Sequence, residues 1–339
     1  MNFKNDIKNS TFIIAEMSAN HNNDFDLAVK TIEAIANTGA NAVKIQTYKP
    51  SSLTLNLDKG YFAKRTEGLW KDYTPWKLYT EASMPYEWQP KLKKKAENLG
   101  LLFFSTPFDI EAVDFLETLD VRIYKIASLE IVDIPLIRYC ASKMKPMIIS
   151  TGVASFKDIE LAVEACREEG NNDITLLKCT SNYPSLISEA NLLTIPDMKK
   201  KFNVKVGVSD HSMGSIVPMV ATSLGAAVVE KHFILDRKLG GPDSSFSMEP
   251  DEFKKMVQNV RDVELSLGKV NYDVSNKDMY RRRSLFVCED IAKGEKLTKV
   301  NIRSIRPGYG LHPKYYFEVL GKTMKKDVKK GTPLSWEMI

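Results

Sequence analysis

The sequence predicts a (β/α)8 TIM barrel, an α/β fold, followed by a small β-rich domain. Short apolar, β-branched segments alternate with amphipathic segments of helical period from residue 12 to about residue 265. Eight segments of each kind fit into this length, which is the number that the barrel requires. A doubly wound open sheet is the main alternative, but no Gly-x-Gly-x-x-Gly sequence follows the first strand segment.

The expected strands share a run of apolar and β-branched residues that ends in polar ones. They are Phe12–Ser18, Ala42–Tyr48, Leu101–Pro107, Arg122–Ser128, Met147–Gly152, Ile174–Ser181, Lys205–Asp210 and Ala227–Phe233. The expected helices carry apolar residues every three or four positions. They are Phe25–Thr38, Trp88–Leu99, Ile110–Thr118, Ile134–Ser142, Phe156–Glu169, Ser188–Lys199, Gly214–Leu224 and Glu252–Gly268.

One connection is much longer than the others and holds about forty residues, rich in Tyr, Trp and Lys, between Tyr48 and Trp88. Long insertions on barrels shape the rim of an active site or a subunit contact. After residue 268 the sequence becomes polar and then shows short strand and turn patterns. We therefore expect a barrel over residues 1–268, a linker over 269–282 and a β-rich domain over 283–339.

Composition and charge exclude several classes of protein. The chain is 43% hydrophobic and 27% charged, which is ordinary for a globular protein. It has neither a long apolar run nor an apolar secretory stretch, so we expect a cytoplasmic protein without a membrane partner. The four cysteines are scattered along the chain, and we expect them to be reduced thiols.

Residues 281–339 carry 14 Lys and Arg against 6 Asp and Glu. Basic and aromatic residues do not interleave there, which argues against nucleic acid, and an anionic small molecule explains the charge equally well.

Two of the four histidines, His211 and His232, end strand segments twenty-one residues apart. This interval fits one strand end, one helix and the next strand, so both imidazoles would lie at one rim of the barrel. Two convergent neutral imidazoles suit a divalent metal ion. The alternative is two unrelated polar residues that finish buried strands. The matching positions and the acidic neighbours Asp210 and Glu230 favour the metal site.

Lysines and hydroxyl groups also gather at the expected strand ends. Lysines inside barrel strands are costly unless they are paired; here they are Lys44, Lys125, Lys178 and Lys231. With nearby hydroxyl groups, they predict a pocket for a phosphate and a carboxylate. A Schiff-base aldolase, which needs one such lysine, is an alternative that the two histidines argue against. Glu16 lies in an apolar strand, where it would handle a proton, bind a hydroxyl group or merely pair with a lysine.

Several strand-end segments carry a resemblance to a known family: Ile14–His21, Val43–Thr47, Ser105–Phe108, Tyr124–Ser128, Gly207–His211 and Glu230–Phe233. On these segments the chain resembles the sialic acid synthases, which condense phosphoenolpyruvate with an amino-sugar aldehyde. The C-terminal part, with Ile305–Gly310, resembles the antifreeze-like (SAF) domain of that family. Ala15–Asn22 and Gly68–Tyr79 are most similar to its pseudaminic acid branch, whose sugar is 2,4-diacetamido-2,4,6-trideoxy-β-L-altrose. Sialic and legionaminic acid synthases use other acetamido sugars with the same chemistry.

The resemblance implies a role for each matching residue. Phosphoenolpyruvate would be held by Lys44, Thr106, Lys125, Ser128, Ser150, Ser209 and either Ser181 or Asn182. The sugar site would be lined by Glu16, Glu130, Tyr183, Asp243 and Phe286. His211 and His232 would ligate Mn²⁺ or Mg²⁺, with Co²⁺ a further candidate. Arg306 would reach the sugar in the barrel of a neighbouring subunit, within a domain-swapped homodimer. The catalytic group would thus be Glu16, His211, His232 and Arg306. A non-catalytic sugar-binding protein remains an alternative of another class.

Overall fold

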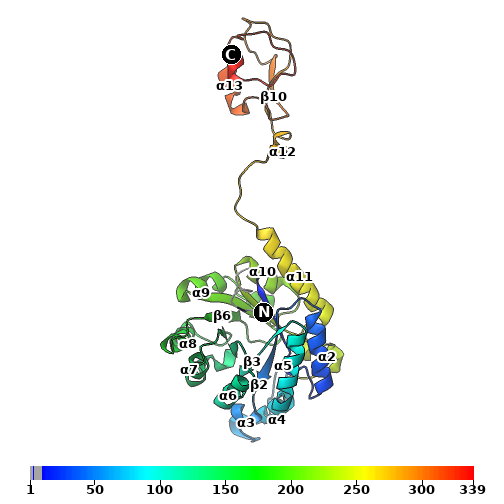
Figure 1. Cartoon of the computed structure of the whole chain (residues 1–339), viewed down its shortest axis with the longest axis vertical. Helices are drawn as coiled ribbons and strands as arrows, with labels where there is room; N and C mark the ends of the chain where they lie inside the picture. Colours follow the sequence, from blue (N-terminus) through cyan, green and yellow to red (C-terminus); the bar gives the residue numbers. More distant parts are fainter. Residues whose placement is uncertain (1–2, 4–9) are drawn as a thin grey trace. The chain divides into compact units, whose positions relative to one another are not determined.

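The chain divides into two compact units, which are described separately below (Figure 1). The computed structural model describes residue 3 and residues 10–339. The larger unit spans residues 1–268 and the smaller unit spans residues 269–339. Each unit has a hydrophobic core of its own.

Eight parallel strands of the larger unit close into a barrel in the order in which they follow along the chain. They are β1 (Phe12–Glu16), β2 (Ala42–Thr47), β3 (Leu102–Pro107), β4 (Tyr124–Ile126), β5 (Met147–Ser150), β6 (Ile174–Cys179), β7 (Lys205–Asp210) and β8 (Val228–His232). Strand β1 pairs with both β2 and β8. The predicted (β/α)8 fold is therefore confirmed, and the open sheet is excluded because its first strand would not also pair with the last.

Helices cover the outside of the barrel (Figure 1). They are α2 (Phe25–Ala36), α5 (Gln89–Asn98), α6 (Ile110–Thr118), α7 (Ile134–Ser142), α8 (Phe156–Glu168), α9 (Thr194–Phe202), α10 (Ile216–Ser223) and α11 (Pro250–Leu267). Three of them begin where an aspartate side chain accepts a hydrogen bond from a backbone N–H three residues later. These capping residues are Asp24, Asp109 and Asp133.

One predicted helix is wrong at both ends. The sequence pattern indicates a helix over Ser188–Lys199, but α9 begins at Thr194 and ends at Phe202. A helix that began at Ser188 would need a backbone N–H at Pro196 to bond back to residue 192, and proline has none. The chain before α9 instead forms a short 3-10 turn, Ile187–Glu189.

The two faces of the strands pack against different surroundings, because successive side chains point to opposite sides. Outward residues, such as Val208 and Val229, belong to the core that the strands share with the helices. Inward residues near the beginnings of the strands form an apolar floor: Phe12, Ile14, Ala42, Leu102, Phe104, Ile123, Ile148, Leu177 and Val228. The floor fills the barrel below, so that the polar residues further along the same faces are confined to the carboxyl ends of the strands.

The long insertion between β2 and α5 is structured. It contains α3 (Pro50–Leu53), the 3-10 turn Gly60–Phe62, α4 (Pro75–Ala82) and the 3-10 turn Tyr86–Trp88. The side chain of Thr74 caps α4 by accepting a hydrogen bond from the N–H of Lys77. The indole Nε1 of Trp70 donates a hydrogen bond to the carbonyl oxygen of Pro242 at 3.0 Å. Since Pro242 follows β8, this bond attaches the insertion to the carboxyl end of the barrel.

The smaller unit is built around an antiparallel pair, β9 (Ser284–Val287) and β10 (Ile302–Ile305). It also contains α12 (Asn276–Met279) and α13 (Tyr316–Val319). Its core consists of Leu285, Val287, Ile291, Leu297, Ile302, Val319, Met324, Val328 and Leu334. Strand β10 was not among the expected segments, because its four residues, Ile-Arg-Ser-Ile, are too short for their alternation to stand out.

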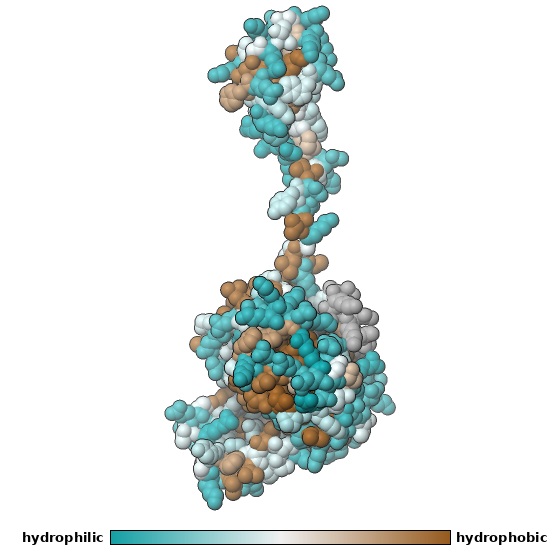
Figure 2. Space-filling model, turned by 90° about the vertical axis from the view of Figure 1, so that its left-hand side faces the viewer, coloured by the Kyte–Doolittle hydropathy of each residue, from teal (hydrophilic) through white to brown (hydrophobic). Residues whose placement is uncertain are grey.

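The surface of the larger unit mixes hydrophilic and hydrophobic residues (Figure 2). Leu129, Leu186 and Leu193, all on the connections around β4 and β6, are 62%, 65% and 77% exposed. In the part of the chain that the structure describes, no helix has the length and apolar character needed to cross a membrane.

Candidate active site

Directly above the apolar floor, the inward faces of the strands carry a buried polar layer. Its members lie two residues beyond a floor position or a glycine on the same strand face: Glu16, Lys44, Thr106, Lys125, Ser150, Cys179, Ser209 and Glu230. Every one of these side chains is buried. Strand alternation has thus placed two glutamates and two lysines inside a closed barrel, where charges require partners.

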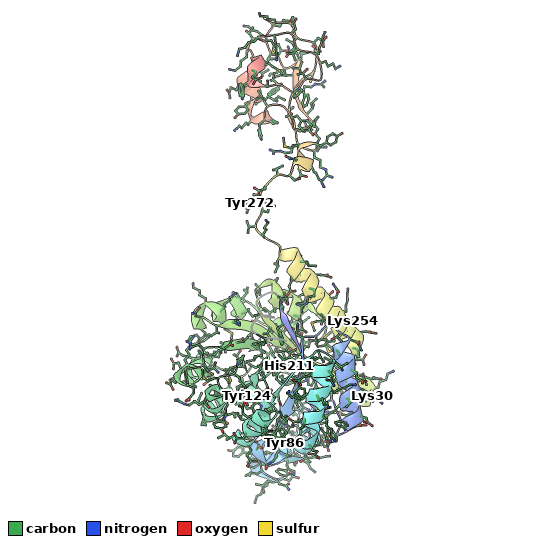
Figure 3. All side chains as sticks on the ribbon, viewed as in Figure 1. Lys30, Tyr86, Tyr124, His211, Lys254 and Tyr272 are labelled. Atoms are coloured by element: carbon green, nitrogen blue, oxygen red, sulfur yellow. The ribbon has the colours of Figure 1, made fainter. Side chains whose placement is uncertain are left out.

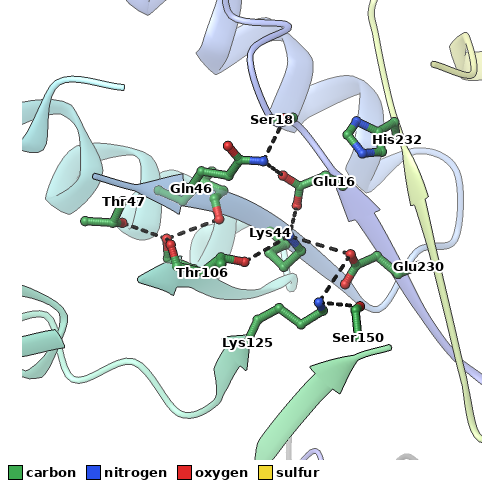
Figure 4. Close-up of polar contacts among 12 residues, drawn as sticks. Glu16, Ser18, Lys44, Gln46, Thr47, Thr106, Lys125, Ser150, Glu230 and His232 are labelled. Carbon is green, nitrogen blue, oxygen red and sulfur yellow. Dashed lines mark hydrogen bonds and ion pairs between the residues drawn. The ribbon is translucent and has the colours of Figure 1, made fainter. Parts of the chain in front are cut away.

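The four charged side chains of the polar layer form a single network (Figure 4). The Lys44 ammonium lies 2.5 Å from Glu16 and 3.6 Å from Glu230, and donates a hydrogen bond to Thr106 Oγ1 at 3.1 Å. Lys125 lies 4.0 Å from the same oxygen of Glu230 and donates to Ser150 Oγ at 2.6 Å. Glu230 therefore joins the two lysines, and the network carries equal numbers of acidic and basic groups.

Burial shifts the protonation of this network. It raises the pKa of Glu16 to about 7, against the opposing effect of Lys44. Burial also lowers the pKa of Lys125, with the Lys44 charge adding to the effect. The second carboxylate oxygen of Glu230, Oε2, has no hydrogen-bond partner among the described residues. The layer can therefore accept a proton near neutral pH and still offers two lysines to an incoming anion.

Three polar groups lie beside the network at the ends of β4, β5 and β6. The N–H of Gly152 donates a hydrogen bond to Ser128 Oγ at 3.0 Å. A Cβ at Gly152 would lie 2.0 Å from Ser181 Oγ and 2.8 Å from Ser128 Oγ. Only glycine therefore allows both hydroxyl groups to occupy this corner of the site.

His211 directly follows β7 and His232 ends β8, and their ring centroids are 5.2 Å apart. Figure 3 places His211 near the middle of the larger unit. Its Nδ1 lies 2.9 Å from the carbonyl oxygen of Thr180, which can only accept a hydrogen bond. Nδ1 therefore carries the proton, and Nε2 is left with its lone pair. The rings of Tyr183 and Phe246 pack on the pair, with centroids 4.3 Å from His211 and 5.0 Å from His232.

The histidine pair fits a divalent metal ion in its donor chemistry. Nδ1 of His232 is buried and has no hydrogen-bond partner among the described residues. Burial lowers the pKa of His232 well below its usual value, which keeps the ring neutral as a metal ligand must be. The bond from His211 to Thr180 orients that ring as ligand histidines usually are. Within residue 3 and residues 10–339, no set of three or more His, Cys, Asp or Glu could enclose an ion, so a metal here would take its other ligands from solvent or substrate.

A cavity of about 350 Å³ opens between the barrel and the insertion. The barrel and its loops contribute Ser18, Gln46, Tyr48, Phe108, Ala127, Ser128, Leu129, Glu130, Val153, Ser181, Tyr183, His232, Pro242 and Asp243. The insertion contributes Leu53, Arg65, Trp70, Leu78, Tyr79 and Ala82. A small organic molecule fits in this volume, with polar groups on the barrel side and a mostly apolar wall on the insertion side.

Two carboxyl groups face this cavity. Burial raises the pKa of Glu130 to about 7 and also raises that of Asp243. Asp243 accepts a hydrogen bond from the N–H of Ala19, at 3.4 Å, and its Oδ2 lies 4.0 Å from Nδ1 of His232. These groups can donate or accept hydrogen bonds, which suits a ligand rich in hydroxyl and amide groups.

The structure divides the four strand lysines into two pairs. Lys44 and Lys125 point into the barrel, as expected. The expectation for Lys178 and Lys231 is wrong, because alternation turns both outward. Lys178 is paired in register with the outward Val208, and its Nζ donates to the carbonyl oxygen of Cys179. Lys231 is buried in a pair with Asp210, 2.5 Å away. Asp210, which the sequence placed beside the histidines, therefore neutralises a structural lysine.

Other predicted residues fall in different places. Ser181 lines the cavity, whereas Asn182 is exposed and its amide donates to Glu189 at 3.0 Å. Of these two candidates, Ser181 is therefore the one whose side chain lines the cavity. Phe286 and Arg306 belong to the smaller unit, where Phe286 is buried on β9 and Arg306 is exposed after β10.

Some site residues were not given a role from the sequence. Gln46 lines the cavity and donates hydrogen bonds to Ser18 Oγ, at 2.9 Å, and to Glu16 Oε1, at 3.4 Å. Glu230 was noted only as an acidic neighbour of His232, although it joins both lysines. Strand alternation could have found Gln46 and Glu230, since each lies two residues from a predicted site residue on its strand. Gly152 and Arg65 gave no such signal.

Comparisons with known proteins agree with this geometry. A model of the NeuB family matches residues 31–272, and a model of the SAF domain matches residues 282–339. The chain is 47% identical to a pseudaminic acid synthase of Campylobacter jejuni, over 98% of this chain and 97% of that protein. It is 36% identical to an N,N'-diacetyllegionaminic acid synthase of Legionella pneumophila, over 97% and 94%. The crystal structure of an N-acetylneuraminic acid (sialic acid) synthetase from Leptospira borgpetersenii has a TM-score of 0.71 at 33% identity, and covers 80% of this chain and 89% of that one.

Gly152→Ala should weaken anion binding, because the added Cβ displaces the hydroxyl groups of Ser181 and Ser128. We expect the dissociation constant for phosphoenolpyruvate, measured by titration calorimetry, to rise about 10- to 100-fold through the loss of one charge-assisted hydrogen bond. Lys157→Ala, an exposed change on α8, is the control and should leave it unchanged. Unaltered affinity in a folded Gly152→Ala protein would show that these hydroxyl groups do not bind the anion.

Glu130 should make the larger unit less stable as the pH rises. Its pKa in the folded protein is about 7, against a usual value of 4.5. Between these values the folded state binds more protons than the unfolded state, so that the free energy of unfolding falls as the pH rises. Glu130→Gln removes this effect, and the variant should gain about 1–3 kcal/mol relative to the wild type between pH 5 and pH 8. Urea unfolding at both values measures the difference, and parallel pH profiles for the two proteins would contradict it.

Proposed function

The chain belongs to the NeuB family, and we propose that it is a pseudaminic acid synthase. The reaction would condense phosphoenolpyruvate with 2,4-diacetamido-2,4,6-trideoxy-β-L-altrose and water, giving pseudaminic acid and phosphate. The identity of 47% over nearly the whole chain supports this substrate more than the 36% to a legionaminic acid synthase supports the alternative. One observation carries the chemistry: the buried lysines Lys44 and Lys125 are joined by Glu230, which lies two residues before His232 on β8.

The polar layer would bind phosphoenolpyruvate. Lys44 and Lys125 neutralise the phosphate and carboxylate, while hydroxyl groups around them donate hydrogen bonds. They are those of Thr106, Ser128, Ser150, Ser181 and Ser209. Glu16 and Glu230 would repel this anion if both were ionised. Because the pKa of Glu16 lies near 7, that carboxyl group can take up a proton as the anion enters.

His211 and His232 would hold Mn²⁺, Mg²⁺ or Co²⁺, which when bound acts as a Lewis acid on the aldehyde of the open-chain sugar. The protein's own part is to keep the His232 ring neutral and to hold both rings in place. Thr180 orients the His211 ring, and Tyr183 and Phe246 pack against the two rings and limit the access of water.

The bond changes of the reaction balance without any further reactant. Carbon 3 of phosphoenolpyruvate bonds to the aldehyde carbon, whose oxygen gains a proton. Water then adds to carbon 2 and loses one proton, which balances the proton gained by the aldehyde oxygen. The bond between carbon 2 and the phosphate oxygen breaks as carbon 2 becomes a ketone, and the remaining hydroxyl proton leaves with the phosphate. Glu230 is the other carboxylate of the polar layer, and it can take the proton from water. The lysines stabilise the charge on the phosphate until it leaves.

Arg306 and the homodimer belong to the same proposal. Arg306 is exposed on the smaller unit, in which Lys and Arg outnumber Asp and Glu. In a domain-swapped dimer, the smaller unit of one copy would cover the barrel of the other and bring Arg306 to the sugar. Phe286 has little free surface within its own unit, so that it would contribute less to this contact.

A phosphate-release assay tests the reaction and its sugar. The purified protein is incubated with phosphoenolpyruvate, Mn²⁺ and one of three sugars: the diacetamido altrose, the 2,4-diacetamido precursor of legionaminic acid, or N-acetylmannosamine. We expect the highest kcat/KM with the altrose derivative. A preference for either other sugar would overturn the substrate, and no phosphate release with any of the three would overturn the reaction. Borohydride that trapped a substrate on Lys125 would favour an aldolase instead.

Removal of divalent metal should abolish turnover. No group of three or more His, Cys, Asp or Glu among the described residues could hold the ion, so we expect modest affinity and a loss of more than about 100-fold after chelation. Mn²⁺ should restore the activity of the wild type but not of His211→Asn or His232→Asn. Calorimetric titration of Mn²⁺ should show binding to the wild type alone. Full activity in protein shown to be free of metal would exclude this role.

A further inference from the structure

The insertion places one cation on the wall of the active-site cavity. Among the residues that line the cavity, Arg65 is the only lysine or arginine. Its side chain is half-buried and has no ion-pair or hydrogen-bond partner among the described residues. Arginines elsewhere on the larger unit, such as Arg138 and Arg237, are engaged by carboxylates. Arg65 therefore offers free N–H donors to whatever occupies the cavity.

The loop around Arg65 fixes the position of this guanidinium. The backbone N–H of Arg65 donates to the carbonyl oxygen of Tyr73 at 3.0 Å, and its carbonyl oxygen accepts from the N–H of Asp72 at 2.9 Å. The guanidinium carbon lies 5.2 Å from the centre of the Trp70 ring, a cation–π contact. Trp70 is held in turn by its hydrogen bond to Pro242 and by the Tyr183 ring, whose centroid is 5.8 Å away. Because the fixed Trp70 ring already holds the guanidinium in place, Arg65 loses less conformational entropy when it binds a ligand.

The remaining insertion residues of the cavity are mostly apolar. Leu53, Leu78 and Ala82 line the wall, and the Tyr79 ring packs edge-on against Tyr48, with centroids 6.2 Å apart. The carboxyl groups that face the cavity, and His232, come from the barrel side instead. A ligand whose reacting end meets His232 would therefore turn its far end toward one cation in apolar surroundings.

We propose that Arg65, supported by Trp70, determines specificity by binding the 4-acetamido group of the sugar. Its guanidinium donates hydrogen bonds to the carbonyl oxygen of that amide, and the neighbouring apolar side chains contact the acetyl methyl group and the 6-methyl group. The assignment rests on the proposed function, which sets an aldehyde at one end of the sugar and the 4-acetamido group and 6-methyl carbon toward the other. A sugar with a 4-hydroxyl group has neither the amide carbonyl oxygen nor the acetyl methyl group that this wall of the cavity would contact.

Phosphoenolpyruvate is the other acceptor that Arg65 could meet. The two buried lysines and the hydroxyl groups of the polar layer already form an anion site on the strands, whereas Arg65 belongs to the insertion. The sugar is therefore the better partner, and the kinetic test separates the two ligands.

The test compares wild type and Arg65→Met with two sugars that differ only at carbon 4, the diacetamido altrose and its 4-hydroxy analogue. We expect Arg65→Met to lower kcat/KM for the diacetamido sugar about 10- to 100-fold, mainly through KM. The analogue should change less than about 3-fold, as should the KM for phosphoenolpyruvate. Arg65→Lys should restore part of the preference. Lys64→Met, an exposed change on the same loop, is the matched control and should behave as the wild type.

Each other result counts against the inference in a defined way. An equal loss with both sugars would make Arg65 a structural residue, and a raised KM for phosphoenolpyruvate would assign it to the anion. If Arg65→Met fails to fold, Arg65→Lys must still reduce the preference for the acetamido sugar, because it loses the planar guanidinium. A wild type inactive with the diacetamido sugar overturns the proposed function itself. If the wild type is active and Arg65→Met has the same kcat/KM as the wild type with both sugars, only the role of Arg65 is overturned.

Discussion

The constraint on which the site depends is the burial of two lysines and two glutamates inside a closed barrel. Each of these charges would cost several kcal/mol if it were buried alone. They are tolerated because Glu16, Lys44, Glu230 and Lys125 form one connected network, with Thr106 and Ser150 accepting further hydrogen bonds. The apolar floor below leaves the charged groups no route to water on that side. They are therefore presented toward the carboxyl end of the barrel, where a substrate can reach them.

The side chains of the site change from charged to apolar between this buried layer and the rim of the barrel. The charged network is followed by the hydroxyl groups beside Gly152, then by the histidine pair, and finally by the aromatic and apolar wall of the insertion. The first three come from strands or from the first residues after them, and in the proposed function they carry out the reaction. The last comes from one loop, which can differ between relatives without disturbing the barrel. The two proposals thus assign the reaction and the choice of sugar to different parts of the chain.

Much of the fold and site could be predicted, and the errors have physical causes. The four strand lysines looked equivalent because each follows apolar residues, yet Lys231 lies directly before His232 and the two cannot face the same side of β8. Applied strictly, the two-residue period would have separated Lys44 and Lys125 from Lys178 and Lys231. The same period would also have identified Glu230 and Gln46. Gly152 was missed for a different reason, since its role depends on hydroxyl groups from β4 and β6 that only closure of the barrel brings to it.

The sequence by itself determined the barrel, the order of its strands, the polar character of their ends and the family, because these follow from periodicity and from motifs that are local along the chain. Only the tertiary structure decided which charges pair, which of Ser181 and Asn182 faces the cavity, and that the Arg65 guanidinium packs on the Trp70 ring at the cavity wall. Those features depend on side chains from strands and loops far apart in the sequence. Their positions are set by the closure of the barrel and by the attachment of the insertion to Pro242, and neither leaves a local pattern.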